Sequence, residues 1–503
     1  MPIARVWSMA LFGVRGVPVE IEADIGVGLP GTTLVGLPDT GLREAKDRVR
    51  SAVRNSRCDW PARKVTLGLS PANLPKVGSA YDLGIALAVL AAAGTVPAGK
   101  LAGTVLLGEL ALDGRIRPVR GVLPSVFGAR DHGFRRVVVP HDTLAEAGLV
   151  DGVEVLGAGS LAEVLAWCRD VVTLRPAPEP REPVEHEIAD LSDVRGQPEA
   201  RWAMEVAAAG GHHILLIGPP GVGKTLLARR LPGLLPPLST GEALEVTAVH
   251  SVGGSLAADA PLVRTPPFIA PHHSISTAAL IGGGSQLAAP GAVSKAHRGV
   301  LFLDESCEFG ANRLDSLRTA LEEGEVRLAR ARGVVTYPAR FQLVMATNPC
   351  PCAPRHEAEC TCSAMARRRY FGKLSGPLLD RVDITVPMHP VKTMHDALAE
   401  QPESTATVRE RVVAARDRAR QRWSEHGWRT NADVPGPRLR TTVAPSPDAT
   451  ALLDRGLRRG FLTARGADKC LRLAWTLTDL AGRGRPGADE VAAAMDLRDR
   501  AAA

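Results

Sequence analysis

Apolar and polar residues alternate along the first third of the chain as they do in half-exposed strands. From Val17 to Ile25 apolar residues alternate with acidic ones, and Lys64 to Leu69 follows a similar pattern. The run from Tyr81 to Ala93 is largely apolar and typical of a buried helix. Further strands are indicated by the apolar residues of Val105 to Leu110 and Arg136 to Val139. These patterns predict a mixed α/β domain over residues 1–172.

Two changes of composition divide the rest of the chain. Residues 177–187 alternate Pro with polar residues and lack an apolar period, so we expect an extended linker over residues 173–188. Between His389 and Thr405 strand-like sequence gives way to a charged helical run, Val408 to Glu425. The expected organisation adds an α/β core with a parallel sheet over residues 189–390 and an α-helical domain over residues 391–503.

A glycine-rich loop lies between an apolar strand, Ile214 to Ile217, and a helical run, Leu226 to Leu231. The loop reads Gly218, Pro219, Pro220, Gly221, Val222, Gly223, Lys224 and Thr225. Strand, GxxxxGKT and helix in this order are typical of a phosphate-binding loop, because its backbone N–H groups and the helix N-terminus attract anions. Lys224 would bridge the β- and γ-phosphates of ATP, and Thr225 would bind Mg²⁺.

Two further apolar strands end in polar residues. Val300 to Leu303 runs into Asp304 and Glu305, and Gln342 to Ala346 runs into Thr347 and Asn348. Downstream of a phosphate-binding loop, Asp304 is expected to hold Mg²⁺ and Glu305 to polarise the attacking water. Asn348 would place a neutral amide beside the γ-phosphate. Alone, each of these strand ends would be a weak signal.

The motifs around these strands resemble those of the AAA+ family of magnesium-chelatase-like proteins, specifically the YifB/ComM group. The matching stretches are Pro271 to Ser274, Gly282 to Gly284, Pro290 to Ser294, Ala296 to Glu305 and Leu378 to Asp383. The resemblance implies an ATP hydrolase that assembles as a ring, a hexamer, with a C-terminal helical lid. It implies that Arg381 is an arginine finger for the neighbouring subunit, whereas the alternative is a surface salt bridge with Asp380 or Asp383. Arg465 is similar to the family's sensor-2 arginine, and Arg472 is its rival.

The family resemblance also implies a substrate. ComM-like proteins are DNA helicases that drive branch migration during recombination, so the resemblance implies single-stranded or branched DNA as partner. Residues 272–290 resemble the pore-facing insert of the family, in which His272 and His273 are expected to shape a loop. A β-hairpin is predicted over Val326 to Ala331 and Val334 to Tyr337, and it carries Arg327, Arg330 and Arg332. These arginines either contact a phosphate backbone or are simply the solvated charges of an exposed hairpin. A chelatase-type motor acting on a protein is the alternative function.

Four cysteines crowd into thirteen residues as two Cys-x-Cys pairs, Cys350 and Cys352, then Cys360 and Cys362. Four thiolates fit a structural zinc site, with redox-active thiols as the competing interpretation and His356 as a possible substitute ligand.

The first domain contains stretches that resemble the Lon-protease-like domain, Pro75 to Ala80 and Gly108 to Arg115. This suggests Ser79 as nucleophile, but Ser125 stands where that pattern has its catalytic lysine, and Lys76 is too near in sequence to be assumed a substitute. We therefore expect a non-proteolytic scaffold that presents basic residues to a partner, namely Arg43, Lys46, Arg48 and Arg50. The GxGxxG pattern at Gly26, Gly28 and Gly31 precedes β-rich sequence, so it predicts a turn and not a dinucleotide site.

Composition narrows the class of protein only broadly. Hydrophobic residues make up 45% and charged residues 23%, which excludes a largely disordered chain. The net charge of +7 permits a polyanionic partner. No secretory signal or membrane-spanning run is visible, so we expect a cytoplasmic protein without membrane association.

Overall fold

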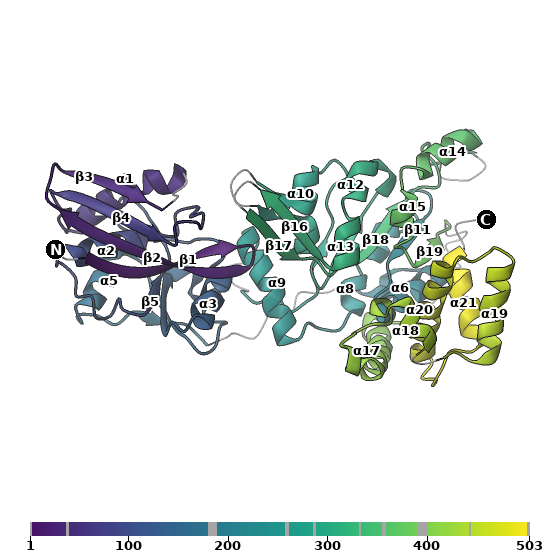
Figure 1. Ribbon diagram of the computed structural model, residues 1–503. Helices are drawn as coiled ribbons and strands as arrows, with labels where there is room; N and C mark the ends of the chain where they lie inside the picture. Colours follow the sequence, from purple (N-terminus) through teal and green to yellow (C-terminus); the bar gives the residue numbers. More distant parts are fainter. Residues whose placement is uncertain are drawn as a thin grey trace.

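The computed structural model describes residues 3–36, 40–179, 189–256, 261–284, 288–330, 333–354, 359–390, 401–441 and 444–499, and the structural statements below concern these residues. The molecule is elongated, with the N-terminal sheet at one end, the parallel sheet in the middle and the C-terminal helices at the other end (Figure 1). Most of the linker expected over residues 173–188 and part of the second expected boundary lie outside the described residues.

The N-terminal part is built on an eight-stranded mixed sheet in the order β10-β9-β8-β5-β1-β2-β4-β3. Its strands are β1 (Ile3–Phe12), β2 (Arg15–Gly26), β3 (Gly31–Val35), β4 (Lys64–Ser70), β5 (Thr104–Leu106), β8 (Arg136–Pro140), β9 (Glu154–Ala158) and β10 (Arg175–Pro176). Its helices are α1 (Thr40–Asn55), α2 (Asp82–Ala92), α3 (Val122–Asp131), α4 (Leu144–Ala147) and α5 (Leu161–Cys168). Separate apolar clusters join the sheet to α1, α2 and α5 and to α3 and α4.

One expected strand of this domain is divided in two. Residues 105–110 form the end of β5 and then β6 (Glu109–Leu110), which pairs with β7 (Ile116–Arg117) outside the main sheet. Gly108 between them has a φ of +154°, and a Cβ there would lie 2.6 Å from the side chain of Ile116. The chain turns at this glycine because the backbone comes so close to Ile116. The hydrophobic pattern of the sequence does not predict such a turn. The glycines of the GxGxxG pattern flank the connection between β2 and β3, as the sequence predicted.

The central part holds a five-stranded sheet in the order β12-β15-β18-β11-β19, in which all neighbouring strands are parallel. The strands are β11 (Ile214–Ile217), β12 (Phe268–Ile269), β15 (Val300–Leu303), β18 (Gln342–Thr347) and β19 (Ile384–Pro387). The helices around it are α6 (Pro198–Gly210), α7 (Lys224–Ala228), α8 (Leu231–Leu234), α9 (Thr240–Gly253), α10 (Thr277–Ile281), α11 (Ala292–Lys295), α12 (Ala311–Asp315), α13 (Arg318–Glu323), α14 (Ala364–Phe371) and α15 (Gly376–Leu379). Parallel pairing places the carboxyl ends of the strands at one edge, where ligands of such sheets bind.

The two small sheets of the central part lie against each other, and one of them also lies against the N-terminal domain. The predicted hairpin is formed by β16 (Glu325–Arg330) and β17 (Gly333–Pro338), and the insert by α10 with β13 (Gly282–Gly283) and β14 (Ala289–Pro290). The tip of the β1–β2 hairpin approaches β17 so closely that a Cβ on Gly13 would lie 2.5 Å from the Thr336 carbonyl oxygen. Leu244 and Ala248 of α9 pack into the cluster of α3 and α4. The N-terminal domain is therefore packed onto the hairpin and α9.

The C-terminal part is helical, as the sequence predicted, and packs onto the parallel-sheet core. Its helices are α17 (Thr405–Arg422), α18 (Gly436–Thr441), α19 (Pro447–Arg458), α20 (Ala464–Leu480) and α21 (Ala488–Asp499). Trp423 and Trp475 are fully buried in an apolar cluster that also contains residues of α6, β11 and β19. None of the helices within the described ranges has the length and apolar character needed to cross a membrane.

A buried ion pair beside the two tryptophans should stabilise these helices. Arg422 Nη1 donates to Asp479 Oδ2 at 3.0 Å, and the guanidinium lies 4.1 Å from the ring centroid of Trp475. We expect Arg422→Met to lower the free energy of unfolding by about 3 kcal/mol, because it leaves the Asp479 carboxylate buried without its cation. Urea unfolding followed by tryptophan fluorescence measures this loss. The matched variant Arg420→Met breaks an exposed pair with Asp417 and should cost less than about 1 kcal/mol; equal losses would contradict the assignment.

Candidate active site

The glycine-rich loop connects the end of β11 to the start of α7 and wraps around the amino group of Lys224. Gly221 and Gly223 have φ values of +83° and +93°, which only glycine adopts readily. Lys224 Nζ donates to the carbonyl oxygens of Gly218 at 2.6 Å and Pro219 at 2.9 Å. Helix α7 begins at Lys224, two residues before the expected start, so its N-terminus faces the loop. The loop has the form needed to surround a phosphate group.

The other predicted residues of the site converge on this loop from β15 and β18. Thr225 Oγ1 donates to Asp304 Oδ2 at 2.6 Å, and Lys224 Nζ donates to Asn348 Oδ1 at 3.1 Å. Burial lowers the pKa of Lys224, and the carboxylates of Asp304 and Glu305 oppose this shift. Three strands thus deliver an ammonium, a hydroxyl, a carboxylate and an amide to one edge of the sheet. These groups fit the phosphates of ATP and an oxygen-coordinated Mg²⁺.

Glu305 contacts His273, a residue that was predicted from the sequence only to shape a loop. Its carboxylate Oε2 lies 3.1 Å from His273 Nδ1, and its backbone has a φ of +50°, unusual for a residue with a side chain. Arg313 Nη1 donates to the His273 carbonyl oxygen at 2.8 Å and fixes the loop that precedes α10. Only the structure connects these residues, because 31 positions lie between them in the sequence.

Gln197 is a second residue that sequence reasoning missed. Its Nε2 donates to the Val222 carbonyl oxygen at 3.3 Å and to the His389 carbonyl oxygen at 2.7 Å. It therefore joins the phosphate-binding loop to the segment after β19. No recognisable pattern surrounds Gln197 in the sequence.

The structure places Arg381 and Arg465 at the opposite edge of the sheet from the phosphate-binding loop. Arg381 precedes β19 and pairs with Glu322 of α13, and not with Asp380 or Asp383. Arg465 Nη1 lies 4.0 Å from Asp380 Oδ2, and its side chain is 79% exposed. The rival, Arg472, donates to the Val434 carbonyl oxygen at 2.8 Å. Neither Arg381 nor Arg465 is brought to the loop of its own chain.

Arg327 is the hairpin arginine whose side chain the structure describes, and it is paired with two carboxylates. Arg327 is exposed, but its guanidinium pairs with Glu325 at 2.6 Å and Glu323 at 3.3 Å. Arg332 lies outside the described residues, as does the side chain of Arg330.

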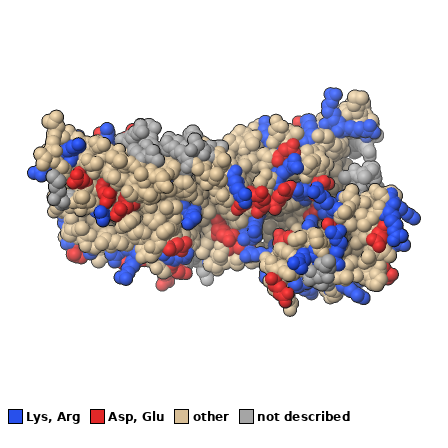
Figure 2. All heavy atoms as spheres, viewed as in Figure 1, with Lys and Arg blue, Asp and Glu red and all other residues tan. Residues whose placement is uncertain are grey.

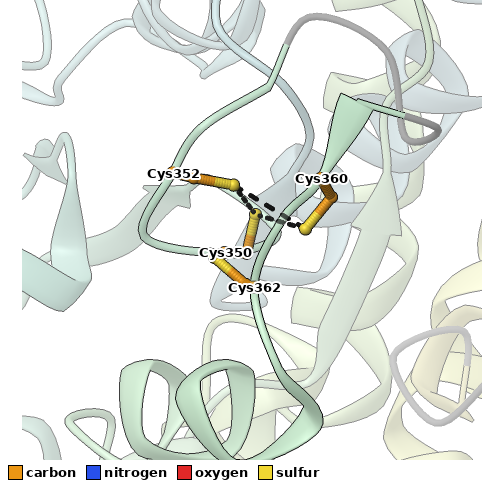
Figure 3. A group of neighbouring side chains, drawn as sticks. All are labelled: Cys350, Cys352, Cys360 and Cys362. Atoms are coloured by element: carbon orange, nitrogen blue, oxygen red, sulfur yellow. Dashed lines mark hydrogen bonds between the residues drawn. The ribbon is translucent and has the colours of Figure 1, made fainter.

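The four clustered cysteines meet in space directly after β18 (Figure 3). The Sγ atoms of Cys350 and Cys352 are 3.3 Å apart, those of Cys350 and Cys360 3.5 Å, and those of Cys352 and Cys360 3.7 Å. All four Sγ atoms, including that of Cys362, lie within 4.8 Å of one another. Tetrahedral zinc with Zn–S bonds of about 2.3 Å needs sulfur separations of about 3.8 Å, so the arrangement fits this ion. His356 lies outside the described residues.

The thiols of the cluster have pKa values shifted in opposite directions. Burial raises the pKa of Cys350 to about 12, whereas a backbone hydrogen bond from Cys362, with contacts to neighbouring thiols and Arg367, lowers that of Cys360 to about 7. Four thiolates this close repel one another unless a metal ion neutralises them.

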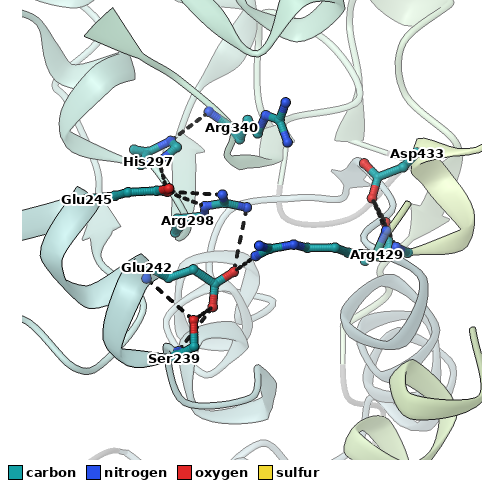
Figure 4. Close-up of polar contacts among 9 residues, drawn as sticks. Ser239, Glu242, Glu245, His297, Arg298, Arg340, Arg429 and Asp433 are labelled. Atoms are coloured by element: carbon teal, nitrogen blue, oxygen red, sulfur yellow. Dashed lines mark hydrogen bonds and ion pairs between the residues drawn. The ribbon is translucent and has the colours of Figure 1, made fainter. Parts of the chain in front are cut away.

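A charged network fixes the segment that leads into β15 (Figure 4). Glu245 of α9 accepts hydrogen bonds from His297 Nε2 at 3.2 Å and from Arg298 Nη2 at 3.0 Å. The His297 contact and the Arg298 charge lower the pKa of Glu245 to about 2. Glu242, one turn earlier, pairs with Arg298 and with Arg429, which lies in a loop of the C-terminal part. The motif before Asp304 therefore ties α9 and the C-terminal part to the strand that carries the carboxylates.

The side chains expected in a protease site do not meet as a serine–lysine dyad in the described structure. Ser79 Oγ donates to the Glu109 carboxylate, whereas the buried Lys76 Nζ donates to the Pro71 carbonyl oxygen. Burial lowers the pKa of Lys76. Ser125 Oγ donates to the Gly121 carbonyl oxygen at 2.7 Å.

One expected partner-binding residue of this domain is structural. Arg48 Nε donates to the buried Asp82 carboxylate at 2.7 Å, so the expectation that Arg48 is presented to a partner is wrong. Burial raises the pKa of Asp82 to about 6 despite this pair. Lys46 and Arg50 are exposed, and the side chain of Arg43 lies outside the described set.

Comparison with known proteins identifies relatives over the full length of the chain. Three family models match: "Subunit ChlI of Mg-chelatase" over residues 21–143, "Magnesium chelatase, subunit ChlI" over 190–396 and its C-terminal model over 402–498. An uncharacterized protein of Mycobacterium tuberculosis is 57% identical over 502 residues, 100% of both chains. The uncharacterized protein YifB of Escherichia coli is 42% identical over 95% of this chain and 94% of its own. Competence protein ComM of Haemophilus influenzae is 37% identical over 99% and 98%.

The cysteine cluster predicts one zinc ion per chain. Protein purified without chelator should release about one equivalent of zinc on thiol modification, measured with a colorimetric zinc indicator. Cys350→Ser should lose most of the metal, because it removes the most buried ligand, whereas Cys58→Ser, outside the cluster, should keep it. Four freely reactive thiols in a metal-free wild-type protein would favour the redox interpretation instead.

Proposed function

Since this chain belongs to the magnesium-chelatase ChlI family of AAA ATPases and is related over its full length to ComM, we propose that it is a DNA motor. In this proposal the chain hydrolyses ATP to translocate on single-stranded or branched DNA, as a ring of subunits in the cytoplasm. The observation that carries the ATPase part is the convergence of Lys224, Thr225 and Asp304 on the phosphate-binding loop.

The residues of the site divide the work of hydrolysis. The backbone N–H groups of residues 218–225 and the Lys224 ammonium bind the phosphates of ATP. Glu305 accepts a proton from the attacking water, and Asn348 orients that water beside the γ-phosphate. Thr225 and Asp304 are the residues to hold Mg²⁺, which, when bound, neutralises charge on the phosphates.

The ring part of the proposal is supported by the position of Arg381. A guanidinium at the far edge of the sheet cannot serve the site of its own chain, but it is available to a neighbouring copy. Its pair with Glu322 keeps it in place until that neighbour binds. Arg465, which is exposed beside Asp380, is proposed to act from the same edge.

DNA is favoured as the substrate by the relation to ComM and by the net charge of +7. Of the hairpin arginines, Arg327 already shares its charge with two carboxylates, so we expect it to contribute little to DNA binding. A contact from Arg330 or Arg332 stays a prediction. A protein substrate remains the alternative outcome of the test, because one motor core serves many substrates.

The first test is the steady-state ATPase rate with and without single-stranded, double-stranded and branched DNA. Glu305→Gln should lower the rate by about 10² to 10⁴, because it removes the general base, while nucleotide binding persists. Lys224→Ala should abolish nucleotide binding, which fluorescent-nucleotide titration measures. DNA should stimulate the wild-type ATPase rate. Branched DNA should be remodelled only by protein that can hydrolyse ATP.

The outcomes separate the two parts of the proposal. An ATPase rate that falls with Glu305→Gln but ignores every form of DNA leaves the motor intact and makes its substrate a protein. A wild-type protein that does not hydrolyse ATP contradicts both parts.

The contact between His273 and Glu305 predicts a restraint on basal hydrolysis. The imidazole occupies one oxygen of the carboxylate that must bind water, and the loop of His273 continues into α10 and the insert. His273→Ala should therefore raise the DNA-independent rate by about two- to fivefold, the factor expected for a partly exposed side-chain contact worth up to about 1 kcal/mol. Stimulation by DNA should shrink correspondingly.

The neighbouring residue supplies the control. His272 is on the same loop and bonds to Ser274 Oγ at 2.8 Å, so His272→Ala should change the basal rate less. A basal rate that falls to background in His273→Ala would mean that the contact positions Glu305 for catalysis instead of restraining it.

A further inference from the structure

Helix α14 begins two residues after the last clustered cysteine and is strongly basic. Residues 363–379 include Arg367, Arg368, Arg369 and Lys373 and contain no Asp or Glu. The helix stands out from the body of the central part in Figure 1, and basic side chains gather over the same place in Figure 2. Nothing in the ATPase site requires this concentration of charge.

Packing of the helix turns the arginines toward solvent. Tyr370 is buried at the end of α14, with its hydroxyl 3.5 Å from Thr347 Oγ1, and Leu374 is buried just beyond the helix. These apolar contacts fix one end of the helix against the strand that carries Asn348. Arg367, Arg368 and Arg369 are exposed as a result.

Two of these arginines have no acidic partner among the described residues. Arg367 Nη2 lies 3.3 Å from Cys360 Sγ, and Lys373 pairs with Glu308 at 3.1 Å. The side chains of Arg368 and Arg369 form no ion pair or hydrogen bond with any described residue. By contrast, Arg411 of α17 is shared by Glu205 and Glu403, and Arg327 of the hairpin by Glu323 and Glu325. The charges of Arg368 and Arg369 are therefore uncompensated within the described part of the chain.

We propose that α14 is a DNA-contacting surface in which Arg368 and Arg369 bind backbone phosphates. This rests on the proposed function and adds a contact site to it. Guanidinium groups match phosphate oxygens in a bidentate geometry and keep their charge at any physiological pH. Adjacent helical positions point about 100° apart, so the two side chains can reach different phosphates.

The chemistry of the helix argues against the other partners of basic segments. A membrane-binding helix needs an apolar face opposite its basic one, but α14 spans only 8 residues and its solvent-facing apolar side chain is Met365. A stable protein interface needs an apolar core within a patch of about 800 Å² per partner. A short, exposed and nearly all-basic surface suits a polyanion better.

The cysteine cluster has a defined part in this surface. Ser363, directly after Cys362, caps α14 by accepting a hydrogen bond from the Ala366 N–H at 3.2 Å. The contact from Arg367 to Cys360 joins the helix to the cluster a second time. A zinc ion bound by the cysteines would therefore fix the direction in which Arg368 and Arg369 point.

The test is a DNA-binding titration of the full-length protein by fluorescence anisotropy at several salt concentrations. The double variant Arg368→Ala/Arg369→Ala should lose two phosphate contacts. The slope of log K, where K is the DNA-binding constant, against the logarithm of the salt concentration should then become less steep by about 1.4 for single-stranded DNA and about 1.8 for duplex DNA. At about 0.2 M salt the affinity should fall by about tenfold. Arg368→Lys/Arg369→Lys keeps both charges and should restore most of the slope.

A matched pair of arginines controls for net charge. Arg458 and Arg459 lie at the end of α19 and are exposed, and their side chains form no ion pair or hydrogen bond with a described residue. Arg458→Ala/Arg459→Ala removes the same charge and should leave the slope within about 0.5 of the wild type. Stripping zinc with a chelator should weaken DNA binding of the wild type but change the Arg368→Ala/Arg369→Ala variant less.

The outcomes distinguish this inference from the proposed function. Wild-type protein that binds no form of DNA overturns both. Wild-type protein that binds DNA, with an unchanged slope in Arg368→Ala/Arg369→Ala or an equal loss in the Arg458 and Arg459 control, overturns the inference alone. Loss of ring assembly in the α14 variant, measured by mass photometry, would also overturn it and make α14 a subunit contact.

Discussion

Parallel pairing of β11, β15 and β18 is the constraint on which the candidate active site depends. Because the three strands run in the same direction and in register, Lys224, Asp304 and Asn348 emerge at one edge, although 124 positions separate the first from the last. The strands are buried on both faces, so a slip of register would expose apolar residues to water. The geometry of the site is thus a consequence of core packing.

Elements distant from the site are connected to it by specific contacts. The network of Glu245, His297 and Arg298 ties α9 to β15, and Arg429 extends it to the C-terminal helices. Helix α9 in turn packs against α3 of the N-terminal domain. On the other side, the loop before α10 reaches Glu305 through His273. A movement of the insert or of the N-terminal domain therefore has a physical route to the carboxylates.

The distribution of charge shows why counts of basic residues are a poor guide to binding surfaces. Arg48 and Arg422 each form an ion pair with a buried carboxylate. Arg327 forms ion pairs with two exposed carboxylates. Arg368 and Arg369 of α14 differ from these three because their side chains have no partner among the described residues. Charge that is already paired within the fold contributes little to attracting a polyanion.

The sequence by itself determined the phosphate-binding loop, the strands that end in Asp304 and Asn348, the hairpin and the cysteine pairs, because each is a local pattern of a few residues. It also predicted the α/β class and the C-terminal helices from periodicity. Only the tertiary structure decided that His273 contacts Glu305, that Gln197 joins the loop to the segment after β19, that Arg381 and Arg465 lie away from their own loop, and that Arg48 pairs with the buried Asp82. These contacts join residues tens to hundreds of positions apart, and such pairings depend on how the elements pack, which no local pattern records.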